Sequence, residues 1–175
     1  MKKLSSLLIA ISAILFASNI NAQTAANMNP KTLAASVIAA SDADRLAMEN
    51  LRLSNVKMYR DFTRNYKNAS AISLEQKEDH TLITCTVDGK KNRILYNKKG
   101  VWQNTVRTYD NEKLSPDMRN QVENGFPRYS IYGPVVEVIT RVGAAHLILI
   151  ENKTSWKRVR IVDGEMDTYE EWNKQ

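Results

Sequence analysis

Cysteine is almost absent from this sequence of 175 residues, which contains only Cys85. One cysteine cannot form a disulfide within the chain, so the fold must be stabilised by packing. In the run Ile83–Val87, strand alternation places Cys85 on the same face as the two apolar end residues. This predicts a buried side chain rather than a nucleophile.

The residue patterns on which most enzymes depend are also missing. There are two histidines, His80 and His146, and neither has an aspartate or cysteine at the spacing of a zinc site. The sequence contains no glycine-rich phosphate loop and no Gly-x-Ser-x-Gly turn. We therefore predict a protein that is not an enzyme and that uses no cofactor or metal.

Carboxylates gather near the carboxyl-terminal end, where a pair of acids could in principle serve glycoside hydrolysis or calcium binding. The four are Glu165, Asp167, Glu170 and Glu171. Alternation predicts Asp167 and Glu171 on one strand face and Glu170 on the other, and no glycine-punctuated calcium loop surrounds them. We expect a solvated strand end.

Long apolar runs are absent except at the start of the chain. Two lysines precede the run Leu7–Ala17, which is too short to span a bilayer, and the small residue Ala22 follows. This pattern predicts a cleaved export signal over residues 1–22 and a periplasmic or secreted mature chain. The cysteine that a bacterial lipoprotein needs just after the cut is missing, so we expect neither a lipid anchor nor a membrane span in the mature chain.

Positive charge is in modest excess. Loss of the two lysines of the signal lowers the formal net charge from +6 to +4 on about 150 residues, the size of one ordinary domain. Such a mild excess is usual for a soluble protein and gives no argument for nucleic-acid binding.

Two units of one helix followed by four strands are predicted after residue 53. In the first unit, apolar residues recur at steps of three and four from Val56 to Tyr66, with Ser54 as the N-cap. Asp88-Gly89 predicts a tight hairpin turn. The strands of this unit are expected at 71–77, 81–87, 91–96 and 101–109.

The second unit opens with Ser115-Pro116-Asp117, the clearest helix start in the sequence: serine caps, proline takes the first helical position and aspartate favours the positive end of the helix dipole. Met118, Val122 and Phe126 form its apolar stripe, and Asp163-Gly164 predicts its hairpin turn. The strands are expected at 135–142, 146–151, 156–162 and 165–172. Helices followed by antiparallel strands, without βαβ alternation, predict an α+β domain.

An offset of 64 residues relates the two units, with Ile83 and Cys85 opposite Leu147 and Leu149. The predicted domain, 54–175, is therefore a tandem repeat of a helix plus an antiparallel β-meander, with units at 54–110 and 113–175. Residues 23–53 precede it as a helical lead-in with a break near Ser41-Asp42, which either packs on the domain or meets a partner.

From residue 54 onward the sequence resembles the PepSY-like, β-lactamase-inhibitor-like proteins secreted by Bacteroidota. The stretches that carry the resemblance are RDFTRNYKNA (60–69), DGKKNR (88–93), YNKKGVW (96–102), KLSPDMR (113–119), KTSWK (153–157) and VDGEM (162–166). The resemblance implies a helix plus a small antiparallel sheet, occurring twice, in a non-enzymatic binding or inhibitory module of the envelope. The actinobacterial β-lactamase inhibitor has disulfides in each repeat, which this chain lacks, so the inhibitory activity itself does not carry over.

Binding residues are predicted on the strand that follows residue 155. Trp156, Arg158 and Arg160 alternate onto one face, and Arg93 and Trp102 extend a similar mixture of cation and aromatic in the first unit. The predicted partner is an envelope protein or an anionic surface polymer. The alternative is an envelope carrier or structural protein that holds a small apolar ligand, for which a sizeable apolar cavity would be needed.

Export should remove residues 1–22 and leave Gln23 as the amino terminus. Intact-mass spectrometry of the protein recovered from the periplasm or medium checks this. A product that retains Met1 to Ala22 would contradict the predicted signal.

Overall fold

A computed structural model describes the backbone of residues 30–175 and the side chains of residues 42–175. The predicted export signal lies outside these residues. Within the described part, no helix is both long enough and apolar enough to cross a membrane.

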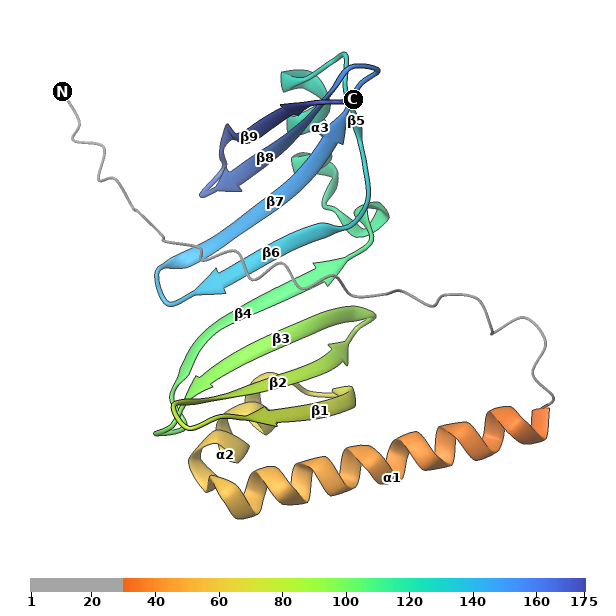
Figure 1. Ribbon diagram of the computed structural model, residues 1–175, viewed down its shortest axis with the longest axis vertical. Helices are drawn as coiled ribbons and strands as arrows, with labels where there is room; N and C mark the ends of the chain where they lie inside the picture. Colours follow the sequence, from red (N-terminus) through yellow and green to blue (C-terminus); the bar gives the residue numbers. More distant parts are fainter. Residues whose placement is uncertain (1–29) are drawn as a thin grey trace.

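The lead-in forms one helix, α1 (Pro30–Ser54). The break predicted near Ser41-Asp42 is wrong, because the helix runs through both residues. Its 25 residues span about 37 Å at the usual rise per residue. Figure 1 shows it running along the β1 edge of the sheet and projecting beyond it.

Two shorter helices begin at side-chain caps. In α2 (Val56–Asn65) the cap is Asn55, whose side chain accepts a hydrogen bond from the Met58 amide, whereas Ser54, the predicted cap, is the last residue of α1. In α3 (Pro116–Gly125) the Ser115 side chain accepts from the Met118 amide, which confirms the predicted start.

Eight of the nine strands follow the predicted pattern closely. The first unit contains β1 (Ser70–Gln76), β2 (His80–Val87), β3 (Lys90–Asn97) and β4 (Trp102–Tyr109). The second contains β5 (Ser130–Ile131), β6 (Val135–Thr140), β7 (Gly143–Glu151), β8 (Ser155–Val162) and β9 (Glu165–Asn173). The two-residue β5 and the short 3₁₀ helix η2 (Asn111–Lys113) were not predicted from the sequence.

All strands belong to one antiparallel sheet in the order β1-β2-β3-β4-β6-β7-β8-β9, with β5 paired to β7. The two meanders are thus joined by the pairing of β4 with β6. Both predicted tight turns are present: Asp88-Gly89 and Asp163-Gly164 each have two positive φ angles, as a type I′ hairpin requires. The predicted α+β class is confirmed in this form.

Two hydrophobic clusters lie on one side of the sheet, called here the helix face. The first contains Leu51, Met58, Phe62, Ile83, Cys85, Ile94 and Tyr96. The second contains Tyr109, Leu114, Val122, Val135, Ile148, Ile150, Val159 and Ile161. Burial of each large aliphatic side chain contributes about 1.5–3 kcal/mol relative to exposure. Both α2 and α3 therefore pack on the same side, behind the sheet in Figure 1.

The register of the predicted repeat is wrong by one residue. Leu147 and Leu149 are half-buried on the side opposite the helices, and it is Ile148 and Ile150 that are buried like Cys85 and its neighbour Ile83. The buried positions of β2 and β7, and those of β3 and β8, are instead 65 residues apart. A slip of one residue exchanges the two faces of a strand, and both faces of β7 are apolar, so the sequence pattern could not reveal it.

The free edge of β1 is covered by α1. The Asp44 carboxylate accepts hydrogen bonds from the backbone amides of Ala71 and Ile72, at 3.0 and 2.6 Å, where a bulge interrupts β1. At the other end of the strand, the Gln76 side chain donates to the Ser54 hydroxyl at 3.1 Å. The helix thus satisfies an edge that would otherwise be open to another strand.

Replacing Cys85 by serine should lower the free energy of unfolding by about 1 kcal/mol or more, because the buried hydroxyl would need a hydrogen-bond partner. Cys85 is 1% exposed, and burial raises the pKa of its thiol to about 11. Urea denaturation checks the change, with Thr84→Ser as the matched control on the other face of β2. Loss of partner binding by Cys85→Ser at unchanged stability would contradict a purely structural role.

Candidate functional site

The side of the sheet away from α2 and α3 is called here the open face, since none of the three described helices packs on it. Strand β8 shows how the sequence divides the two sides: Ser155, Lys157, Val159 and Ile161 lie on the helix face, where all but Lys157 are buried, while the residues that alternate with them turn outward. These outward residues are Trp156, Arg158 and Arg160, the three that the sequence places on one face. The structure brings them together as predicted.

Aromatic rings gather at one end of this row. Trp156 pairs with Trp172 of β9 in the strand register, and Tyr132 packs edge-to-face against Trp156 with ring centroids 4.8 Å apart. The Lys174 ammonium lies 4.3 Å from the centroid of Trp156. Tyr132 is 49% and Trp172 39% exposed, so this cluster presents a large aromatic area to solvent.

Each arginine of β8 lies between a carboxylate and an aromatic ring of β9. Arg158 forms an ion pair with Glu170 and lies 5.5 Å from the centre of the Trp172 ring. Arg160 donates two hydrogen bonds to Asp167 and lies 5.3 Å from the Tyr169 ring. These contacts fix the planar guanidinium groups, which lowers the entropy that a partner must remove on binding.

The carboxylates of β9 are not placed as alternation predicts. A bulge between Asp167 and Glu170 adds one residue to β9, so both carboxylates lie on the open face, opposite Arg160 and Arg158. Glu171 lies on the helix face and pairs with Lys157. The expectation that Asp167 and Glu171 share a face is therefore wrong, because strand alternation does not hold across a bulge.

The other two predicted binding residues lie elsewhere. Arg93 is on the open face, between Thr84 and Val106 in the register, but four strand spacings separate β3 from β8, about 19 Å at the usual spacing. Trp102 is on the helix face, where its indole N–H donates to the Thr105 hydroxyl at 3.0 Å beside the first hydrophobic cluster. The structure therefore does not bring Trp102 to the surface formed by β8.

The middle of the open face is apolar. Half-buried aliphatic side chains on β4, β6 and β7 fill the space between Arg93 and the β8 arginines: Val106, Val136, Val138, Leu147 and Leu149. An apolar centre flanked by fixed cations and aromatic rings is the arrangement of a protein-binding surface.

A polar row on the helix face, which was not predicted from the sequence, crosses the boundary between the two hydrophobic clusters. Arg107 bridges Asn92 and Glu137, at 3.1 Å to each, and His146 lies 3.7 Å from Glu137. The Glu137 side chain is 13% exposed and that of His146 15%. Thr105, Arg107 and Tyr109 occupy alternate positions of β4, so the burial of the outer two could have indicated that Arg107 faces inward. Its partner Glu137 could not be predicted, because it depends on the pairing of β4 with β6.

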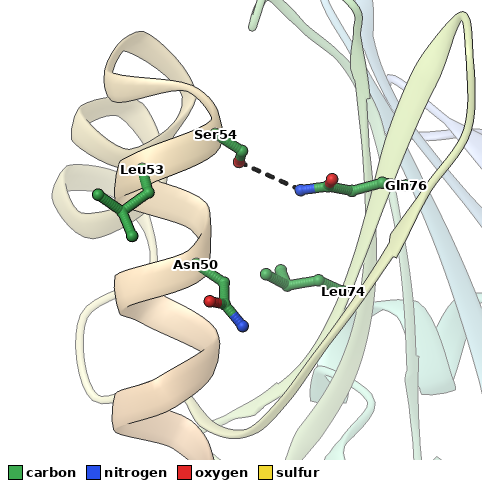
Figure 2. A pocket seen from close by; sticks show the side chains of 5 residues that line it. All are labelled: Asn50, Leu53, Ser54, Leu74 and Gln76. Atoms are coloured by element: carbon green, nitrogen blue, oxygen red, sulfur yellow. Dashed lines mark hydrogen bonds between the residues drawn. The ribbon is translucent and has the colours of Figure 1, made fainter.

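Two of the hollows among residues 42–175 lie beside helices. The larger, about 540 Å³, lies between α1 and β1 and is lined by Asn50, Leu53, Ser54, Leu74 and Gln76. Figure 2 shows that the Ser54–Gln76 hydrogen bond closes one end of it. The smaller, about 350 Å³, lies beside α3 and includes His146, Asp117 and Asp163. Both are lined by polar as well as apolar groups, so neither is the apolar cavity that a carrier needs.

Metal-binding clusters and exposed cysteine nucleophiles are not found among residues 42–175. Among residues 42–175, no group of three or more histidine, cysteine or carboxylate side chains could hold a metal ion. Cys85 is buried, and burial lowers the pKa of His146 below its usual value, so the imidazole is neutral at pH 7.

Several solved structures of Bacteroides proteins share the architecture. A BLIP-like protein of Bacteroides fragilis is 17% identical and superposes with a TM-score of 0.52, over 68% of this chain and 85% of that one. A DUF2874 family protein of Bacteroides ovatus is 15% identical, with a TM-score of 0.52 over 67% and 85%. The fold is BLIP-like.

The resemblance to the β-lactamase-inhibitor-like proteins of Bacteroidota is thereby confirmed at the level of the fold. A third solved structure, that of a candidate periplasmic protein of Bacteroides eggerthii, is 12% identical, with a TM-score of 0.50 over 67% of this chain and 86% of that one. No family model and no curated protein matches the sequence. At these identities the likeness concerns the fold, and function must be argued from the surfaces.

The free energy of unfolding should fall as the pH drops from about 7 to 5.5. Burial lowers the pKa of His146, so the unfolded chain binds a proton near pH 6.5 that the folded chain resists. Stability is therefore full above this range and declines below it, at most by about 1.4 kcal/mol per pH unit. Urea titrations at several pH values measure it.

The substitution His146→Asn should flatten this decline, whereas His80→Asn, which removes the other histidine, should leave it in place. An equal slope in wild type and His146→Asn would show that His146 does not cause the pH dependence.

Proposed function

We propose that this chain is an exported, non-enzymatic binding module that docks on another protein of the cell envelope through its open face. The observation that carries the proposal is the juxtaposition of Trp156 and Trp172 with Arg158 and Arg160 beside an uncovered apolar stripe. Aromatic and arginine side chains of this kind supply most of the affinity in protein interfaces.

A protein partner fits this surface better than an anionic polymer. Each arginine of β8 is already neutralised by Asp167 or Glu170, and those two carboxylates are 52% and 46% exposed. A polyanion approaching the arginines would meet these carboxylates as well. A protein surface can offer hydrogen-bond donors to the carboxylates and acceptors to the remaining guanidinium N–H groups, so the mixed charge selects for a folded partner.

We infer further that the two units are copies of one PepSY-like element, with residues 1–22 as the export signal and 23–53 as the lead-in. In support, the helices correspond at an offset of 60 residues: Met58 and Phe62 occupy the places of Met118 and Val122. An inhibitory or regulatory effect would follow if docking covers the partner's own working site.

The test compares two double variants of the mature chain. Trp156→Ala with Arg158→Ala should weaken binding at least about tenfold, because it removes the half-buried anchor and its neighbouring cation. Lys98→Ala with Lys99→Ala, at the exposed turn after β3, should change it less than about threefold, since exposed charges mainly tune association rates. A partner is first captured from envelope extract and identified, and its dissociation constants are then measured with purified proteins.

Circular dichroism should be unchanged in both double variants. Equal affinity of the two for the purified partner would remove the open face as the docking surface. Loss of the folded spectrum in the Trp156 variant would instead place this tryptophan among the residues that stabilise the fold.

A further inference from the structure

Strand β9 forms the second edge of the sheet, and it differs from the edge that α1 covers. It pairs with β8 on one side, and no element of residues 30–175 pairs with it on the other. Of its nine residues, every one except Met166 is exposed. Unpaired backbone amides and carbonyls along a strand of this length can bond to another extended chain.

The register identifies which backbone groups point outward. Val162 and Glu165 close the two-residue Asp163-Gly164 turn, and in such a hairpin the closing pair exchanges both backbone hydrogen bonds. Since the pattern alternates, the amides and carbonyls of Met166 and Thr168 point away from β8. These groups are available to an additional strand.

The charges of β9 determine which chain could pair there. The strand contains four carboxylates and no lysine or arginine. Three rows across the sheet alternate a cation on β8 with a carboxylate on β9: Lys157 with Glu171, Arg158 with Glu170, and Arg160 with Asp167. A cation on the next strand would continue each row, because opposite charges directly across a pair of strands stabilise the sheet.

The same charges disfavour pairing with a second copy of β9. In most registers such a pair would place carboxylates opposite carboxylates with no cation between them, which destabilises a sheet. Edge charge of one sign is the usual protection against self-association, and it leaves open the pairing with a chain of the other sign.

We propose that β9 accepts an extended segment of a partner protein that carries lysine or arginine at alternate positions, as a tenth strand of the sheet. The main chain of the segment would bond to the outward groups of Met166 and Thr168, and its cations would lie beside Asp167 and Glu170, two carboxylates of β9 on the open face. This mode of strand addition derives affinity from the backbone and specificity from the side chains. It goes beyond the docking of a folded partner on the open face and does not depend on it.

The probe is a peptide of alternating lysine and threonine with the length of β9, and the control is its glutamate and threonine counterpart. Titration into the mature chain is followed by NMR of the backbone amides. The lysine peptide should shift the amide signals of Met166 and Thr168 and slow hydrogen exchange at Thr168 at least about tenfold, because a paired amide is protected. The glutamate peptide should do neither.

The variant Thr168→Pro removes one outward N–H group, which contributes nothing to the pairing with β8, and proline is tolerated at such positions of edge strands. It should bind the lysine peptide at least about tenfold more weakly. The matched control Thr168→Val keeps the N–H group and should bind like wild type.

Three outcomes would overturn the proposal: equal binding by Thr168→Pro and wild type, equal binding of both peptides, or amide shifts confined to residues of the open face. If Thr168→Pro does not fold, exchange in the wild-type chain decides alone, and an unprotected Thr168 amide in the presence of saturating lysine peptide overturns the proposal. The open-face proposal is tested with the captured partner and the Trp156 variant, so the two can fail separately.

Discussion

The antiparallel pairing of β4 with β6 is the contact on which the rest of the structure depends. Five residue pairs, from Thr105–Ile139 to Tyr109–Val135, join two meanders that would each otherwise expose an edge. Arg107 and Glu137 form an ion pair across this junction, and removal of either would leave the other charge without its partner in a poorly solvated place. Because the junction makes one sheet of the two units, both short helices cover the same side. A continuous open face results, wide enough for a protein partner.

Most of the element order could be predicted from the sequence because local patterns determine it. The Ser115-Pro116 start, the two Asp-Gly turns and the alternating strands each depend on residues within a few positions of one another. Where two local signals compete, prediction fails: Ser54 and Asn55 are both good caps, and α1 continues through Ser54 until Asn55 caps α2. The break expected near Ser41 fails for a similar reason, since favourable helix formers on both sides outweigh one serine and one aspartate.

The candidate binding surface could be predicted only in part, and the reason lies in non-local geometry. Alternation sufficed to place Trp156 and the β8 arginines on one face, but their partners depend on the bulge in β9, which leaves no clear signal in a strand composed mostly of polar residues. Trp102 illustrates the converse. A bulge between β3 and β4 shifts the register beside it, and the indole lies on the helix face, against the first hydrophobic cluster, instead of on the open face. In both cases one extra residue changes the side of the sheet on which a side chain lies.

The open face and the β9 edge share residues, which makes their occupancy interdependent if both bind. Asp167 and Glu170 hold the guanidinium groups of Arg160 and Arg158 in position, and the same carboxylates line the outer edge. A cation arriving at the edge would compete with those arginines for the carboxylate oxygens and free guanidinium N–H groups toward the open face. Acceptors on a partner at the open face would in turn draw the arginines away and leave the carboxylates to an edge cation.

By linkage, each occupant changes the affinity of the other by the same factor. The coupling is favourable because each occupant binds the group that the other one displaces. The edge cation pairs with the carboxylate, and the acceptor on the open face pairs with the arginine.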